Sequence, residues 1–132
     1  MTIATCHDWK NTSMPAAHAT VDLVRNYSLR EFNSICRGII PEQMEDKWFV
    51  FYTSPWLHVH RSWSGFCIYE VRFNEGQNGA TIAEVRINMD PAQHAGGSDP
   101  TLLGILLDSW AGRDSRQAMI DWIKSRNHGG GS

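Results

Sequence analysis

The spacing of apolar residues divides the chain into helical and extended segments. Helical spacing flanks a central block in which aromatic and β-branched residues form short runs, as is typical of strands. Helices are predicted at 15–26, 28–38, 99–112 and from residue 114 onward. Strands are predicted at 47–52, 56–60, 66–73 and 81–89. Because short connections make neighbouring strands antiparallel, the sequence predicts an α+β fold, a four-stranded antiparallel meander with N-terminal and C-terminal helices packed on one face.

Capping residues mark several element boundaries. Ser28 and Glu31 have the spacing of a capping box, and Gly38 is a suitable residue for the end of that helix. Asp99 followed by Pro100 is typical of a helix start. The organisation expected is a loosely ordered N-terminus at 1–14, a single α+β domain at 15–128 and a Gly/Ser linker scar at 129–132.

The last two predicted strands indicate their own pairing. Both carry an alternating apolar–Glu–Val–Arg–apolar pattern, and a Gly-rich loop at 74–80 separates them. A register centred on Asn78 places opposite charges and matched apolar residues across from each other. The pairs expected are Tyr69 with Ile87, Glu70 with Arg86, Val71 with Val85, and Arg72 with Glu84. The charged face is either a solvent-facing ladder that fixes the register or one wall of a ligand site.

Composition narrows the possible functions. The net charge of −2 and the absence of a basic run argue against a nucleic-acid partner. No apolar run reaches transmembrane length, so no membrane association is expected. Three cysteines without a CxxC motif favour reduced thiols and a cytoplasmic location. Six tryptophans indicate an aromatic core, in which we expect Trp48 and Trp122 to be mostly buried.

The richest cluster of functional side chains is the turn between the second and third predicted strands. It contains His60, Arg61, Ser62, Trp63 and Ser64. Hydroxyl and backbone N–H groups in a tight turn can hold an anion, and arginine adds a two-pronged donor. The indole could stack on a base or a sugar. The simpler interpretation is a β-turn whose serines bond local backbone and whose tryptophan belongs to the core.

Other chemistry is less supported by the sequence. His58 and His60 share a face of one strand, but zinc needs at least three protein ligands, so no metal and no cofactor is predicted. Cys67 alternates with Tyr69 onto the expected core face, where a thiol is usually inert. The pair Glu45–Asp46 could serve acid–base chemistry, or it could only solvate a turn.

Two stretches carry a resemblance to known proteins. Met44-Glu45-Asp46-Lys47-Trp48-Phe49 and His60-Arg61-Ser62-Trp63-Ser64-Gly65-Phe66-Cys67-Ile68-Tyr69-Glu70-Val71-Arg72-Phe73 resemble the core of a group of small uncharacterised bacterial proteins. The resemblance covers about the central third of the chain. It implies a bacterial or phage-type cytoplasmic protein and carries no activity, ligand or partner with it.

Two functional hypotheses follow from these observations. The first is a small-ligand-binding domain, an enzyme or a simple binder, for an anionic ligand of nucleotide or ADP-ribose type held by residues 60–64. The second is a non-enzymatic protein-interaction module, such as an immunity or inhibitor protein, because exposed Trp and Arg residues are common interface hot spots. A concave pocket that holds Arg61 and a tryptophan favours the first, and a flat aromatic patch favours the second.

Overall fold

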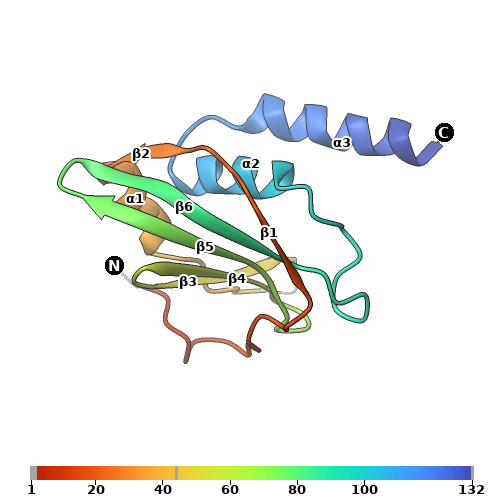
Figure 1. The fold of residues 1–132 in the computed structure, drawn as a ribbon, viewed down its shortest axis with the longest axis horizontal. Coiled ribbons are helices and arrows are strands. Elements are labelled where there is room, and N and C mark those ends of the chain that lie inside the picture. The colour runs from red at the N-terminus through yellow and green to blue at the C-terminus, as the bar shows by residue number, and fades with distance from the viewer. Residues whose placement is uncertain (1–2, 44, 132) are drawn as a thin grey trace.

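The computed structural model describes residues 3–43 and 45–131, with side chains described as far as Arg126. It shows an α+β chain with an antiparallel sheet and three helices (Figure 1). The elements in chain order are β1 (His18–Val21), β2 (Asn26–Ser28), α1 (Leu29–Cys36), β3 (Trp48–Thr53), β4 (Trp56–Arg61), β5 (Cys67–Gly76), β6 (Gly79–Asn88), α2 (Thr101–Trp110) and α3 (Arg116–Gly131).

The sheet has six strands instead of the expected four. Strands β3 to β6 form the predicted meander, and the order across the sheet is β1-β6-β5-β4-β3, with β2 also paired to β6. The helix predicted at 15–26 is wrong, because that segment contains strand β1 and leads into strand β2. Its burial alternates residue by residue along β1, and it pairs with β6 from His18 opposite Asn88 to Val21 opposite Val85. Pairing with an otherwise unpaired strand edge therefore outweighs a weak helical pattern.

The predicted hairpin register is confirmed, but a β-bulge helps to produce it. Glu70 pairs with Arg86, and Val71 pairs with Val85. The loop is shorter than expected, since β5 runs to Gly76 and β6 begins at Gly79. A register shift between Arg72 and Phe73 takes up the difference. Without this shift of one residue, the charged side chains of β6 would lie on the opposite face of the sheet from those of β5.

A second irregularity changes the position of Cys67. The register between β4 and β5 shifts at Val59/His60, so that Val59 pairs with Tyr69 whereas His60 pairs with Cys67. The expectation that Cys67 shares the core face with Tyr69 is therefore wrong. Ile68 joins the core around Tyr69 instead. Burial raises the pKa of the Cys67 thiol, which keeps it protonated and unreactive.

The main core joins the sheet to two helices. Residues Phe32 and Ile35 of α1 and Leu103 and Leu107 of α2 pack in one cluster with residues of β3 to β6. Figure 1 shows α2 beside the sheet and α3 beyond it. Trp48 is partly buried against this core, whereas the partly buried Trp122 lines two hollows beside α3. The layer formed by α2 and α3 therefore leaves open space near one end of the sheet.

The N-terminal segment lies along the body of the domain at three points. The backbone N–H of Ala4 donates to the carbonyl of Arg37, and Ala4 packs with Phe49 and Phe51 in a second, smaller core. The Trp9 indole N–H donates to the Ser62 carbonyl at 2.7 Å. The backbone N–H of Thr12 donates to Gly65, so the segment is held although it lacks regular secondary structure.

Candidate functional site

The structure separates the side chains of the predicted 60–64 cluster. His60 is 2% exposed and lies between Phe49 and Phe51, with ring centroids 5.6 and 5.4 Å away. Burial lowers its pKa to about 4, so the imidazole is neutral at pH 7. Arg61, the next residue, faces the other side of the sheet, where its guanidinium lies 4.5 Å from the centre of the Trp48 ring.

The two serines of the cluster are engaged in holding the turn. Ser62 is 2% exposed, and its hydroxyl donates to the carbonyl of Asp46. The Ser64 hydroxyl accepts from the backbone N–H of Phe66 at 3.2 Å. Trp63 lies at the tip and is 69% exposed. Of the five predicted residues, Arg61 alone lines one of the described hollows in the surface.

Arg61 belongs to a cleft of about 480 Å³, which we call the arginine cleft. Its walls come from β4, β5, the loop before α2, α2 and α3. The lining residues include Arg61, Tyr69, His94, Trp122 and Arg126. The Tyr69 and His94 rings meet edge to face at 6.3 Å, and the Arg126 guanidinium lies 4.8 Å from the Trp122 ring centre. The cleft thus combines two arginines with three aromatic rings.

The charges in the arginine cleft are unbalanced. Among the described residues, neither Arg61 nor Arg126 forms an ion pair. One carboxylate, that of Asp99, also lines the cleft, where it offsets one of the two positive charges and accepts from the Thr101 backbone N–H at 2.9 Å and from the Thr101 hydroxyl at 2.6 Å. Two guanidinium groups facing a partly enclosed space attract an anion, and each offers several N–H donors.

The two titratable rings in the cleft respond to this environment. Desolvation lowers the pKa of His94, and the positive charge of Arg61 lowers it further. Burial raises the pKa of Tyr69. At neutral pH both rings therefore carry no charge, and each can donate or accept a hydrogen bond. A bound anion would reverse part of the effect on His94, because it would offset the charge of Arg61.

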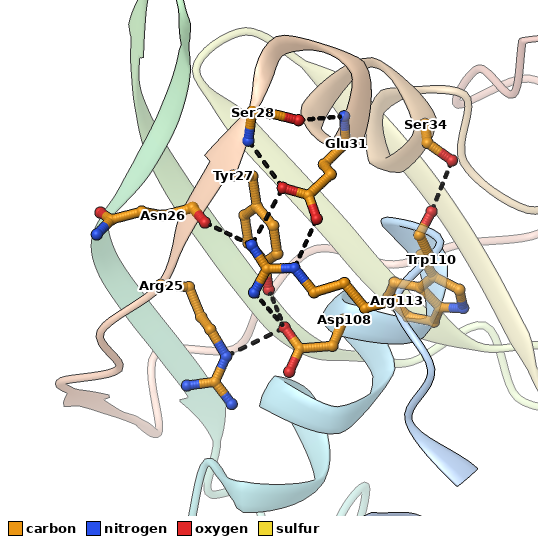
Figure 2. A network of polar contacts seen from close by, with 9 residues as sticks. All are labelled: Arg25, Asn26, Tyr27, Ser28, Glu31, Ser34, Asp108, Trp110 and Arg113. Atoms are coloured by element: carbon orange, nitrogen blue, oxygen red, sulfur yellow. Dashed lines mark hydrogen bonds and ion pairs between the residues drawn. The ribbon is translucent and has the colours of Figure 1, made fainter.

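The densest polar network of the described chain lies elsewhere and is saturated (Figure 2). The Arg113 guanidinium donates to both Glu31 oxygens, at 2.6 and 3.1 Å, and to the Asn26 carbonyl at 2.7 Å. Asp108 accepts from the Tyr27 hydroxyl at 2.7 Å and from Arg25 at 3.1 Å. These contacts join β2, α1, α2 and the loop before α3. The side chains of Arg25, Tyr27 and Arg113 each donate to an acceptor within the protein, so the network holds the fold together.

A third polar group lies on the sheet face that carries the charged ladder. His58 Nδ1 is 2.9 Å from Glu70 Oε2, and the other Glu70 oxygen is 3.8 Å from Arg86. The hydrogen bond with His58 is the main cause that lowers the pKa of Glu70. In the described part of the chain, no three His, Cys, Asp or Glu side chains lie close enough to bind a metal ion together. On this face of the sheet, Glu70 is therefore paired with both His58 and Arg86.

Sequence reasoning identified Arg61 and missed its partners in the cleft. His94 lies in the loop before α2, and Trp122 and Arg126 lie one turn apart on α3, so no local motif joins them to Arg61. Only the folded arrangement brings them together, because the turn after β4 lies near the loop before α2.

Within the described residues, no helix has the length and apolar character needed to cross a membrane.

Comparison with known proteins gives no further guide to function. No family model, no curated protein sequence and no solved structure matches the chain at a significant level.

Proposed function

We propose that the protein binds a small anionic ligand of nucleotide or ADP-ribose type in the arginine cleft, with Arg61 and Arg126 as its principal contacts. The observation that carries the proposal is that both guanidinium groups line one cleft and neither forms an ion pair with a described residue. An arginine without a carboxylate partner keeps its donors available for a phosphate or carboxylate.

The aromatic walls favour an organic anion over a simple inorganic one. Trp122 of α3 and Tyr69 of β5 both line the cleft. Flat aromatic surfaces bind rings and sugars through large apolar contact at low conformational cost. The cleft volume of about 480 Å³ falls within the range of small-molecule sites, roughly 300–1,000 Å³.

Calorimetric titration with ADP-ribose, AMP and pyrophosphate tests the proposal. Arg61→Ala and Arg126→Ala should each weaken binding by about 10- to 100-fold, since a hydrogen bond to a charged group contributes about 1.5–3 kcal/mol. Arg30→Ala is the matched control, because Arg30 is exposed on α1 and lines none of the described hollows. Absence of binding by the native chain, or equal binding by the Arg61→Ala chain, would contradict the proposal.

The protein-interaction hypothesis has one observation in its favour. Trp63 is 69% exposed at the tip of the β4–β5 turn, and Ile123 on α3 is 46% exposed. Exposed tryptophans are common interface anchors. Trp63→Ser should leave binding of small anions unchanged, whereas it should abolish capture of a protein partner. Loss of anion binding in Trp63→Ser would assign that indole to the ligand site instead.

A further inference from the structure

A second hollow lies directly beside the arginine cleft. Its volume is about 700 Å³, and it lies between α2, α3 and the β1–β2 connection. Asp99, Trp122 and Arg126 line both hollows. A ligand held by Arg126 and packed on Trp122 can therefore extend from one hollow into the other.

The two hollows differ in chemistry. Leu23, Pro100, Ile105 and Ala118 contribute apolar surface to the second hollow. Its positive charge from Arg25 is balanced, because Arg25 Nε donates to Asp108 at 3.1 Å. Of the two arginines that line the arginine cleft and form no ion pair with a described residue, only Arg126 also lines the second hollow. An anionic group therefore belongs in the arginine cleft, and an uncharged part of the ligand belongs in the second hollow.

The polar groups of the second hollow lie among its apolar walls. The side chains of Thr101, Asp121 and Ser125 line it and carry hydroxyl or carboxylate oxygens. The Thr101 hydroxyl already donates to Asp99 at 2.6 Å, and the Asp121 carboxylate already accepts from Gln117 at 2.9 Å. These oxygens have further lone pairs, which an alkyl chain would leave unused. A heteroaromatic base uses both kinds of surface, since its faces pack on apolar side chains and its edge exchanges hydrogen bonds.

From this juxtaposition we infer that the second hollow is a base subsite and that the ligand is a nucleoside phosphate. Its phosphate lies at Arg61 and Arg126, and its base lies beyond Trp122 against Ile105 and Ala118. This inference rests on the proposed function and specifies it. Thr101, Asp121 and Ser125 become the residues that distinguish one base from another.

A pair of ligands that differ only in the base tests the inference. Ribose 5-phosphate and AMP share the sugar and the phosphate, so their difference in affinity measures the base alone. The native chain should bind AMP about tenfold or more tightly than ribose 5-phosphate, because stacking of one base contributes about that much. Equal affinities for the two ligands would overturn the base subsite and leave the anion site intact.

Two variants that fill the second hollow, and a control variant that does not, test where the base lies. Ala118→Trp and Ser125→Trp place an indole in the second hollow from exposed positions on α3, whereas Ile120→Trp adds one on α3 at a residue that lines neither hollow. The first two variants should lose the preference for AMP and keep the affinity for ribose 5-phosphate. Ile120→Trp should keep both.

The possible failures are distinguishable. A preference for AMP that survives both filled variants would place the base elsewhere and overturn the inference alone. Failure of the native chain to bind either ligand or pyrophosphate would overturn the proposed function as well. Circular dichroism and a melting curve for each variant show that the comparison is made between folded chains.

Discussion

Arg113 and Arg61 each make a cation–π contact, but the two side chains differ in their other contacts. Each guanidinium lies over an aromatic ring, 4.7 Å from the centre of Tyr27 for Arg113 and 4.5 Å from that of Trp48 for Arg61. Arg113 then donates to Glu31 and to the Asn26 carbonyl. Arg61 faces a cleft and forms no ion pair with a described residue.

The difference lies in what surrounds the edge of each guanidinium. Around Arg113, helix α1 brings the Glu31 carboxylate and strand β2 the Asn26 carbonyl into hydrogen-bonding distance, and helix α2 brings Asp108 to 3.8 Å, so the charge contributes to holding those elements together. Around Arg61, the nearby Asp99 is already bonded to Thr101. An arginine in the first setting contributes to folding, and one in the second setting contributes mainly to binding.

The largest expected effect is on stability in the saturated network. Asp108→Ala should lower the free energy of unfolding by about 1–3 kcal/mol, because it leaves the Tyr27 hydroxyl and Arg25 without their acceptor. Arg61→Ala should lower it by less than about 1 kcal/mol, since it removes a cation–π contact alone. Urea unfolding of both variants measures the contrast. Equal losses would show that Arg61 also holds the fold.

A smaller effect is expected from pH at the arginine cleft. The charged and titratable groups that line the cleft with His94 are Arg61, Tyr69, Asp99 and Arg126, and burial and the charge of Arg61 lower the pKa of His94. A bound anion raises that pKa, so binding takes up a proton and tightens as pH falls, by at most about tenfold per pH unit.

Titration of AMP between about pH 8 and pH 5.5 measures this linkage. His94→Gln is the reference chain, because the titration of the phosphate itself affects both chains equally. The native chain should gain affinity toward acid pH relative to the variant. Parallel pH profiles would remove His94 from the site.

The saturated network has a pH dependence of its own. Hydrogen bonds from Arg113 and from the Ser28 backbone N–H lower the pKa of Glu31 from 4.5 to about 2. The ionised Glu31 therefore stabilises the fold above pH 4.5, and this contribution is lost as the pH falls toward about 2. The deficit of Glu31→Gln in unfolding experiments should shrink over that interval. A deficit that stays constant would mean that the charge of Glu31 does not matter.

The smallest expected effect concerns Arg86, whose surroundings lie between those of the other two arginines. It lies 4.3 Å from the centre of Trp56 and is 3.8 Å from Glu70. A double-mutant cycle with Glu70→Arg and Arg86→Glu should give a coupling of about 0.2–1 kcal/mol, as for other partly exposed ion pairs. Zero coupling would show that the paired register does not depend on these charges.

Local signals in the sequence predicted their own structures well. The capping box works as expected, since the Ser28 side chain accepts from Glu31 N and the Glu31 carboxylate accepts from Ser28 N. The alternating pattern of the hairpin predicted the register that the structure shows between Tyr69–Ile87 and Arg72–Glu84. Both signals depend on residues that are close in sequence or directly paired.

Features that depend on distant neighbours could not be predicted in the same way. The segment of β1 is extended because β6 offers it an edge, and nothing within its own residues requires that pairing. The bulge at Val59/His60 decides which face receives Cys67, and alternation alone gives the opposite answer. The arginine cleft likewise depends on how the loop before α2 and α3 lie relative to Arg61.

The side-chain NMR signals of the arginines test the central claim most directly. In a ¹⁵N-labelled chain titrated with AMP, the Nε–Hε signals of Arg61 and Arg126 should shift, because both would bond the phosphate. The signals of Arg25 and Arg113 should stay in place, because their acceptors are within the protein. Shifts at Arg113, or no shift at Arg61, would contradict the division between a saturated network and an open anion site.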